Sequence, residues 1–100
     1  MNTTIQTENE KTLVTLEGRL DTTNVTDFEK QIQPLLTMSN PDIIMECENF
    51  NYISSSGLRL FLTLQKKVLA NRGKMVLKNM KPEIKEVFDM TGFSSIFTIE

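Results

Sequence analysis

The amino-acid sequence predicts an α/β domain with a mixed, mostly parallel central sheet. Short segments with the two-residue apolar period of a strand alternate with longer segments whose apolar residues recur at helical spacing. The expected order is β-β-α-β-α-β-α-β, in which the first two strands form a hairpin and each helix then connects two parallel strands. The 100 residues fit one domain, expected to span residues 1–100.

The first third of the chain is expected to form a hairpin and a helix. Residues 4–7 and 11–17 are predicted strands joined by a turn, and Gly18 is expected to end the second strand. Side chains that commonly cap helices occupy residues 21–24 and predict a helix start. The apolar face of this helix carries Val25, Phe28, Ile32, Leu35 and Leu36.

A buried strand and the longest helix are expected in the middle of the chain. Residues 42–47 predict a central strand, and residues 48–52 a loop after it. The helix opens at residues 54–57, and Leu60 and Leu64 widen its apolar arc to ~200°. Deep burial explains such a wide arc, and the alternative is that Leu60 is partly exposed for a partner. The core stripe of this helix is expected to contain Leu58, Phe61, Leu62, Val68 and Leu69.

The last third of the chain is expected to add two strands and a helix. Gly73 is the predicted C-terminal cap of the long helix, and residues 74–78 are a further strand. Pro82 is expected to begin the last helix and Gly92 to close it. Apolar residues within 93–99 predict a final strand.

Composition and charge exclude several classes of function. The chain is 39% hydrophobic and 24% charged with a net charge of -2, which is too apolar and too balanced for disorder. Its 11 basic residues are scattered and outnumbered by 13 acidic ones, so nucleic acid is not expected as a partner. The N-terminus does not resemble a signal peptide, and no apolar run is long enough to insert into a membrane.

Residue usage also argues against an enzyme. Histidine, the commonest general base and metal ligand, is absent. Cys47 is the only cysteine, so no disulfide can form within the chain, and a reducing, cytoplasmic location is expected. Without a second thiol or an imidazole, Cys47 is predicted to be a small buried apolar side chain, and neither a metal nor a cofactor is expected.

The run Ser54-Ser55-Ser56-Gly57 at the start of the long helix is the most informative segment. A serine oxygen can cap the helix by accepting from a free backbone N–H, which contributes ~1 kcal/mol. The same geometry suits a regulatory phosphate, because free N–H groups and the helix dipole stabilise an added dianion without melting the helix. Taken alone, the run favours the capping interpretation.

Three segments carry a resemblance to a known family. The first is GRLD at residues 18–21, similar to a G-x-L-D motif followed by an apolar helix, and the second is YISSSGLR at residues 52–59, similar to D-S-S/A-G-L. The third runs from residues 77–79 through Pro82 to TGF at residues 91–93, similar to a closing strand and a T-G-hydrophobic helix end. In this order they resemble the STAS domain of bacterial anti-sigma factor antagonists, across nearly the whole chain. The resemblance implies helices packed chiefly on one face of the sheet.

The resemblance also implies a phosphorylation switch. In such antagonists the serine immediately before the glycine, here Ser56, is phosphorylated by a partner that is both an anti-sigma factor and a serine kinase. The unphosphorylated antagonist captures this partner and frees a sigma factor for transcription; phosphorylation breaks the complex, and a serine phosphatase restores it. Many members carry an aspartate where this chain has Ser54, and this departure leaves open that Ser54 or Ser55 is phosphorylated instead. The expected partner-binding residues are Asp21, Thr22, Ser54, Ser55, Gly57, Arg59 and Leu60.

Two other functions stay open at this level. Standalone STAS proteins also resemble small non-catalytic subunits that dock on the ATPase of bacterial lipid-transport ABC systems. Genes for a permease and an ATPase beside this gene would favour that function, whereas a gene for a histidine-kinase-like ATPase would favour the switch. The second alternative is an enzyme that acts through Cys47 or the serines, which the absence of histidine disfavours.

Overall fold

The computed structural model describes residues 1–100 and confirms the predicted α/β class. A five-stranded sheet has the order β1-β2-β3-β4-β5, in which β1 is antiparallel to β2 and every other neighbouring pair is parallel. The mixed, mostly parallel sheet is therefore confirmed. In chain order the elements are β1 (Asn2–Glu8), β2 (Lys11–Leu20), α1 (Val25–Leu36), β3 (Asp42–Ile53), α2 (Ser55–Ala70), β4 (Lys74–Lys78), α3 (Pro82–Met90), a 3-10 helix (Phe93–Ser95) and β5 (Thr98–Ile99).

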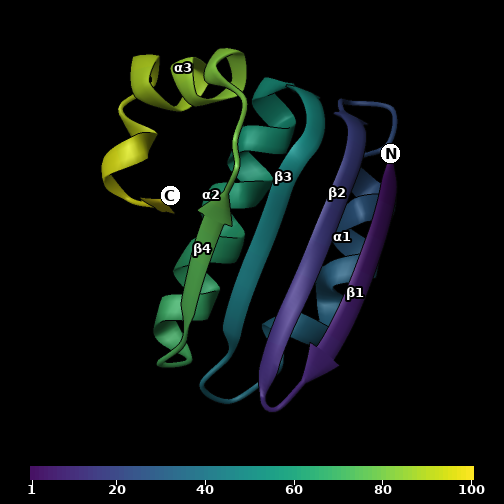
Figure 1. Ribbon diagram of the computed structural model, residues 1–100, viewed down its shortest axis with the longest axis vertical. Helices are drawn as coiled ribbons and strands as arrows, with labels where there is room; N and C mark the ends of the chain where they lie inside the picture. Colours follow the sequence, from purple (N-terminus) through teal and green to yellow (C-terminus); the bar gives the residue numbers. More distant parts are fainter.

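The helices lie chiefly on one face of the sheet, as expected. Figure 1 shows β1 to β4 in front, α1 and α2 behind them, and α3 beyond the upper end of the strands. The parallel strands β2 and β3 run upward in this view, and α1 and α2 start where these strands end. Residues 21–24 and 54–57 therefore meet at the edge of the sheet where β2 and β3 end, although they lie far apart in the sequence.

The strand β2 alternates as predicted but continues past its predicted end. Thr12, Val14 and Leu16 are buried beneath the helices. Gly18 does not end the strand, which continues to Leu20. The φ of Gly18 is +104°, a backbone conformation open to glycine, and the pairing with β3 shifts directly after it. Glycine thus permits an irregularity within the strand instead of terminating it.

The strand β3 is twice the predicted length, because residues 48–52 continue it to Ile53 instead of forming a loop. Its register with β2 shifts twice. The first shift lies between the pairs Thr15–Glu46 and Glu17–Asn49, and the second lies between Gly18–Phe50 and Arg19–Tyr52. Each shift is a bulge with one extra residue on β3, and each moves the following side chains to the other face. The buried positions accordingly step from Cys47 to Phe50 and then to Ile53.

One phenylalanine connects the helices with the sheet. The ring centroid of Phe61 on α2 lies 6.1 Å from Phe28 on α1, 6.0 Å from Phe50 on β3 and 6.2 Å from Phe88 on α3. All four side chains are buried. Such aromatic pairs contribute ~0.5–1.5 kcal/mol beyond the burial of their area, so this cluster fixes α2 against three other elements.

The end of α2 differs from the prediction. Arg72, not Gly73, adopts the left-handed conformation, with a φ of +62°. Gly73 is needed for a different reason: a Cβ at this position would lie 2.3 Å from the backbone oxygen of Pro41. Leu69 was expected in the core but is 53% exposed, because the buried stripe runs through Leu64 and Val68.

The C-terminal segment follows the prediction for the last helix but only in part for the final strand, because residues 93–95 form a 3-10 helix. The helix α3 begins at Pro82, and Gly92 lies just past its end with a φ of +77°. The final strand is present but contains only Thr98–Ile99, which pairs with β4. The short strand gives the sheet a brief outer edge on this side.

The contact between Gly73 and Pro41 can be tested by substitution. We expect Gly73→Ala to lower the free energy of unfolding by ~1–3 kcal/mol, because the added methyl group meets backbone that cannot turn aside. Gly92→Asn is the control, since nothing lies within 4 Å of its Cβ position and asparagine tolerates a positive φ. Urea denaturation measures both, and wild-type stability of Gly73→Ala would contradict this packing.

Candidate functional site

The serine run begins α2 through a hydrogen-bonded cap. Ser54 has an extended backbone, and its Oγ accepts a hydrogen bond from the Gly57 N–H at 3.1 Å. The Ser54 N–H donates to the Leu20 carbonyl at 2.9 Å, which joins the turn to the end of β2. The capping interpretation of the sequence therefore holds for Ser54, and the same residue links the two strands that end at this edge.

Gly57 is a packing residue and not part of an open surface. It is buried, and a Cβ at this position would lie 2.9 Å and 3.0 Å from side-chain atoms of Leu20 and 3.1 Å from Ile53. The absence of a side chain lets the first turn of α2 lie directly on these two residues. Gly57 was expected in the partner-binding surface, and the core covers its own atoms.

The hydroxyl groups of Ser55 and Ser56 differ in their surroundings. Ser56 is half-buried, and its Oγ lies 3.0 Å from the Ser54 Oγ in a hydrogen bond. Ser55 is exposed and its side chain makes no hydrogen bond. No backbone carbonyl accepts from the N–H groups of Ser55 or Ser56, which occupy the first turn where a helix has no internal acceptors. The turn thus offers two free donors beside a hydroxyl.

Ser56 lies at a groove between α1 and α2 with a volume of about 260 Å³. From α2 the groove also receives Arg59 and Thr63, both exposed, and the edge of Leu60. Leu60 itself is only 8% exposed, so deep burial explains its place in the apolar arc, and the alternative of an exposed Leu60 is wrong. The sequence did not indicate the α1 side of the groove, which consists of Val25, Thr26 and Glu29.

Asp21 forms the neighbouring part of this edge in the turn after β2. Its Oδ1 accepts hydrogen bonds from the side chain and the backbone N–H of Thr23, and its Oδ2 lies 4.0 Å from the Nε of Arg19. The bonds from Thr23, aided by the Arg19 charge, hold the pKa of Asp21 below its ordinary value. Asp21 remains ionised, and its turn is closed by the Asn24 Oδ1, which accepts from the Asp21 N–H at 2.9 Å.

The predicted partner-binding residues therefore divide into groups. Ser56, Arg59 and the edge of Leu60 share the interhelical groove. Asp21 lines a separate hollow of about 480 Å³ with residues of β1 and β2. Thr22 is exposed and lines neither hollow.

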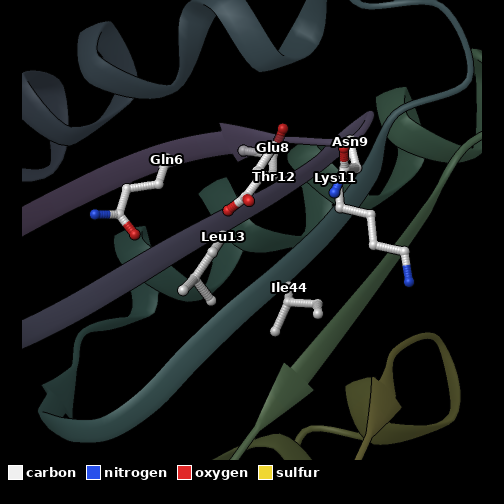
Figure 2. A pocket seen from close by; sticks show the side chains of 7 residues that line it. All are labelled: Gln6, Glu8, Asn9, Lys11, Thr12, Leu13 and Ile44. Carbon is white, nitrogen blue, oxygen red and sulfur yellow. The ribbon is translucent and has the colours of Figure 1, made fainter.

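Other parts of the molecule offer little catalytic chemistry. Cys47 is fully buried, and burial, with a smaller effect of Glu46, raises the pKa of its thiol to about 12. No three His, Cys, Asp or Glu side chains gather where they could hold a metal ion. A hollow of about 420 Å³ lies near the β1–β2 turn, and Glu8 and Thr12 are among the residues that line it (Figure 2). The Thr12 hydroxyl, the only one in the lining, is hydrogen-bonded to the Thr7 hydroxyl at 3.2 Å.

These features define a small α/β domain that presents a capped serine turn and an adjoining interhelical groove at one edge of its sheet. The STAS domain model matches residues 2–100. The chain therefore belongs to the STAS domain family. None of its helices combines the length and apolar character that crossing a lipid bilayer requires.

Two relatives in sequence and one solved structure resemble this chain over most of its length. BtrV of Bordetella bronchiseptica, which carries the name of an anti-sigma factor antagonist, is 31% identical over 84 residues, covering 84% of this chain and 72% of that protein. The anti-sigma-B factor antagonist of Staphylococcus aureus is 27% identical over 101 residues, covering 99% and 94%. The solved structure of the Bacillus cell fate determinant SpoIIAA in its phosphorylated form has a TM-score of 0.76 at 23% identity, covering 99% and 91%. The names of the two sequence relatives describe regulators, not enzymes.

The hydrogen bond of the Ser54 cap predicts a difference between adjacent serines. We expect Ser54→Ala to lower the free energy of unfolding by ~1 kcal/mol, because the Gly57 N–H loses its acceptor. Ser55→Ala, at an exposed hydroxyl without a hydrogen bond, should stay within ~0.5 kcal/mol of wild type. Thermal and urea unfolding measure both, and equal losses in the two variants would contradict the assigned cap.

The buried thiol predicts a decline of stability at alkaline pH. The pKa of Cys47 rises from 9.0 to about 12 on folding, so above pH 9 the unfolded chain holds fewer protons and stability falls as pH rises. We expect the stability of wild type relative to Cys47→Ala to fall as pH rises from 9 toward 12, with a slope that approaches about 1.4 kcal/mol per pH unit. Urea unfolding at several pH values measures the difference, and a constant difference would contradict the burial of the thiol.

Proposed function

We propose that this chain is a cytoplasmic anti-sigma factor antagonist whose binding to an anti-sigma factor is switched by phosphorylation of Ser56. The observation that carries the proposal is the position of the Ser56 hydroxyl. It lies half-buried at the groove between α1 and α2, at a helix start with two free N–H groups. The family membership and the names of the relatives support the partner class.

The partner would dock over the edge where β2 and β3 end. The ionised Asp21 and the exposed Thr22 and Ser55 stand on one side of the turn, and Arg59 stands on the groove side. A single partner surface that covers the start of α2 would contact both sides. In this proposal Leu60 and Gly57 are buried below the surface, and their packing holds the start of α2 in place.

Phosphorylation would change this surface without unfolding it. A phosphoserine brings a charge of about -1.5 to -2 and three acceptor oxygens. The N–H groups of Ser55 and Ser56 and the helix dipole can stabilise that charge, so α2 keeps its start. The dianion would instead meet the docked partner in a desolvated interface, where an unmatched charge weakens binding strongly. Kinase and phosphatase therefore act on the partner's affinity and not on the fold.

The role requires no chemistry from the chain itself. The serine hydroxyls have no histidine to activate them, because the chain contains none, and the thiol is buried with a raised pKa. In the proposed cycle the anti-sigma factor supplies the serine kinase activity, and a separate serine phosphatase removes the phosphate. The SpoIIAA structure with a matching fold, solved in its phosphorylated form, supports a fold that carries the modification.

The site assignment is tested by phosphorylation of the purified chain. We expect the cognate kinase and ATP to add one phosphate, which mass spectrometry should place on Ser56, and we expect Ser56→Ala to abolish the labelling. Ser54→Ala and Ser55→Ala are the matched controls, since they remove the neighbouring hydroxyls and should still be labelled. Undiminished labelling of Ser56→Ala would sink the assignment of the site. Stable binding to a transporter ATPase without labelling would favour the non-catalytic ABC subunit instead.

The charge mechanism is tested by affinity. We expect Ser56→Asp to weaken binding to the anti-sigma factor by at least tenfold, or about 1.4 kcal/mol, in titration calorimetry. Ser95→Asp adds the same charge at an exposed residue of the C-terminal 3-10 helix and should bind as wild type does. Equal affinities for Ser56→Asp and wild type would count against charge as the switch.

A further inference from the structure

The outer edge of β1 is long, regular and unprotected. Seven residues, Asn2–Glu8, pair with β2 in one continuous register without a bulge. The strand contains no proline or lysine, two of the usual devices that prevent a sheet edge from pairing with another strand. The opposite edge of the sheet is β5, which has only two residues. One side of the sheet therefore keeps a row of backbone donors and acceptors open to solvent.

The turn between β1 and β2 determines which backbone groups point outward. Asn9 and Glu10 both have positive φ, 51° and 67°, which makes this a two-residue hairpin turn of the primed type. The residues that flank such a turn, Glu8 and Lys11, exchange hydrogen bonds with each other. Hydrogen bonding to β2 then alternates along β1, and Thr3, Ile5 and Thr7 direct their N–H and C=O groups away from the sheet.

We propose that this edge pairs antiparallel with the β1 edge of a second copy of the chain, with the two-fold axis at Ile5. Antiparallel pairing joins outward residues to outward residues. Among such registers, only the one centred on Ile5 uses all the outward groups within the strand. It places Thr3 opposite Thr7 of the second copy and Ile5 opposite Ile5. Each of these pairs exchanges two hydrogen bonds, as in any antiparallel ladder.

The side chains fit this symmetric register. Ile5 is a large apolar residue that remains 37% exposed, and the pairing would bring two such side chains together on the helix side. Thr3 and Thr7 form cross-strand threonine pairs, a favourable combination in sheets. The only charge on the strand, Glu8, meets Asn2 of the second copy, so no like charges oppose each other. A second copy can therefore bond the free backbone groups of β1, and the side chains of the two strands fit each other.

The other exposed sheet surface does not match itself in this way. The open face carries the apolar row Leu13-Ile44-Val76, with Asp42-Lys74 on one side of it and Thr15-Glu46-Lys78 on the other. A two-fold axis along the apolar row would set Asp42 against Glu46 and Lys74 against Lys78. Since like charges at an interface oppose association, self-pairing is favoured at the edge and not at the face.

The pairing would leave the serine turns free. Because the two copies run antiparallel, the edges that carry Ser54–Ser56 lie at opposite ends of the joined sheet. One partner could then dock at each end without contacting the other. The dimer and the proposed switch are separate features, so either can fail without the other.

Cysteine crosslinking tests the register in the full chain. Opposed residues of a hydrogen-bonded pair lie ~5.5 Å apart at Cα, a separation that a disulfide spans. Under mild oxidation we expect Ile5→Cys to form a covalent dimer by itself, and a mixture of Thr3→Cys with Thr7→Cys to form one only when both are present. Leu13→Cys, on the open face, is the control and should stay monomeric. The native Cys47 is buried and does not interfere.

Sedimentation of the wild-type chain tests the association itself. We expect its apparent mass to double as protein concentration rises into the millimolar range, and Ile5→Lys, which sets two like charges at the axis, to remain monomeric. Ile5→Val keeps the donor and the apolar contact and should dimerise. A wild-type chain that stays monomeric throughout, or an Ile5→Cys that crosslinks no better than Leu13→Cys, overturns the proposal. Pairing of the edge only with a strand from another protein would do the same.

Discussion

The close approach of α2 to the sheet at Gly57 is the constraint on which the serine turn depends. Any side chain at this position would collide with Leu20 and Ile53, the last residues of the two strands below. The Ser54 N–H bond to the Leu20 carbonyl fixes the same point through the backbone. One turn further, Phe61 anchors the helix among three other phenylalanines. The start of α2 is therefore set by the core, and Ser56 has a fixed position relative to the groove.

The sequence predicted those features that depend on local pattern. Helix starts, the serine cap and the alternation of β2 follow from capping residues and periodicity. The assignment of Ser56 as the phosphorylated residue rests on a family resemblance and remains a proposal. Features that depend on distant contacts were missed. The bulges in β3 break the alternation of residues 48–52, and Gly73 serves a contact with Pro41 across the fold. Glu29 joined the site only through helix packing, which no local pattern in the sequence specifies.

The two contact surfaces proposed above lie on different sides of one sheet and differ in kind. The edge above β2 and β3 is built from side chains on capped turns, so its recognition depends on particular charges and hydroxyls. The side edge at β1 offers backbone groups. Its recognition depends on strand register and on the absence of side chains that would keep another strand away. The core between them is a single cluster that supports both.

The neutral cap at Ser54 has a consequence for how the surface responds to its surroundings. A serine cap does not titrate, the chain has no histidine, and the lowered pKa of Asp21 keeps that carboxylate ionised under mildly acidic conditions. Mild acidification would therefore leave the charge of Asp21 and the neutral cap at Ser54 unchanged.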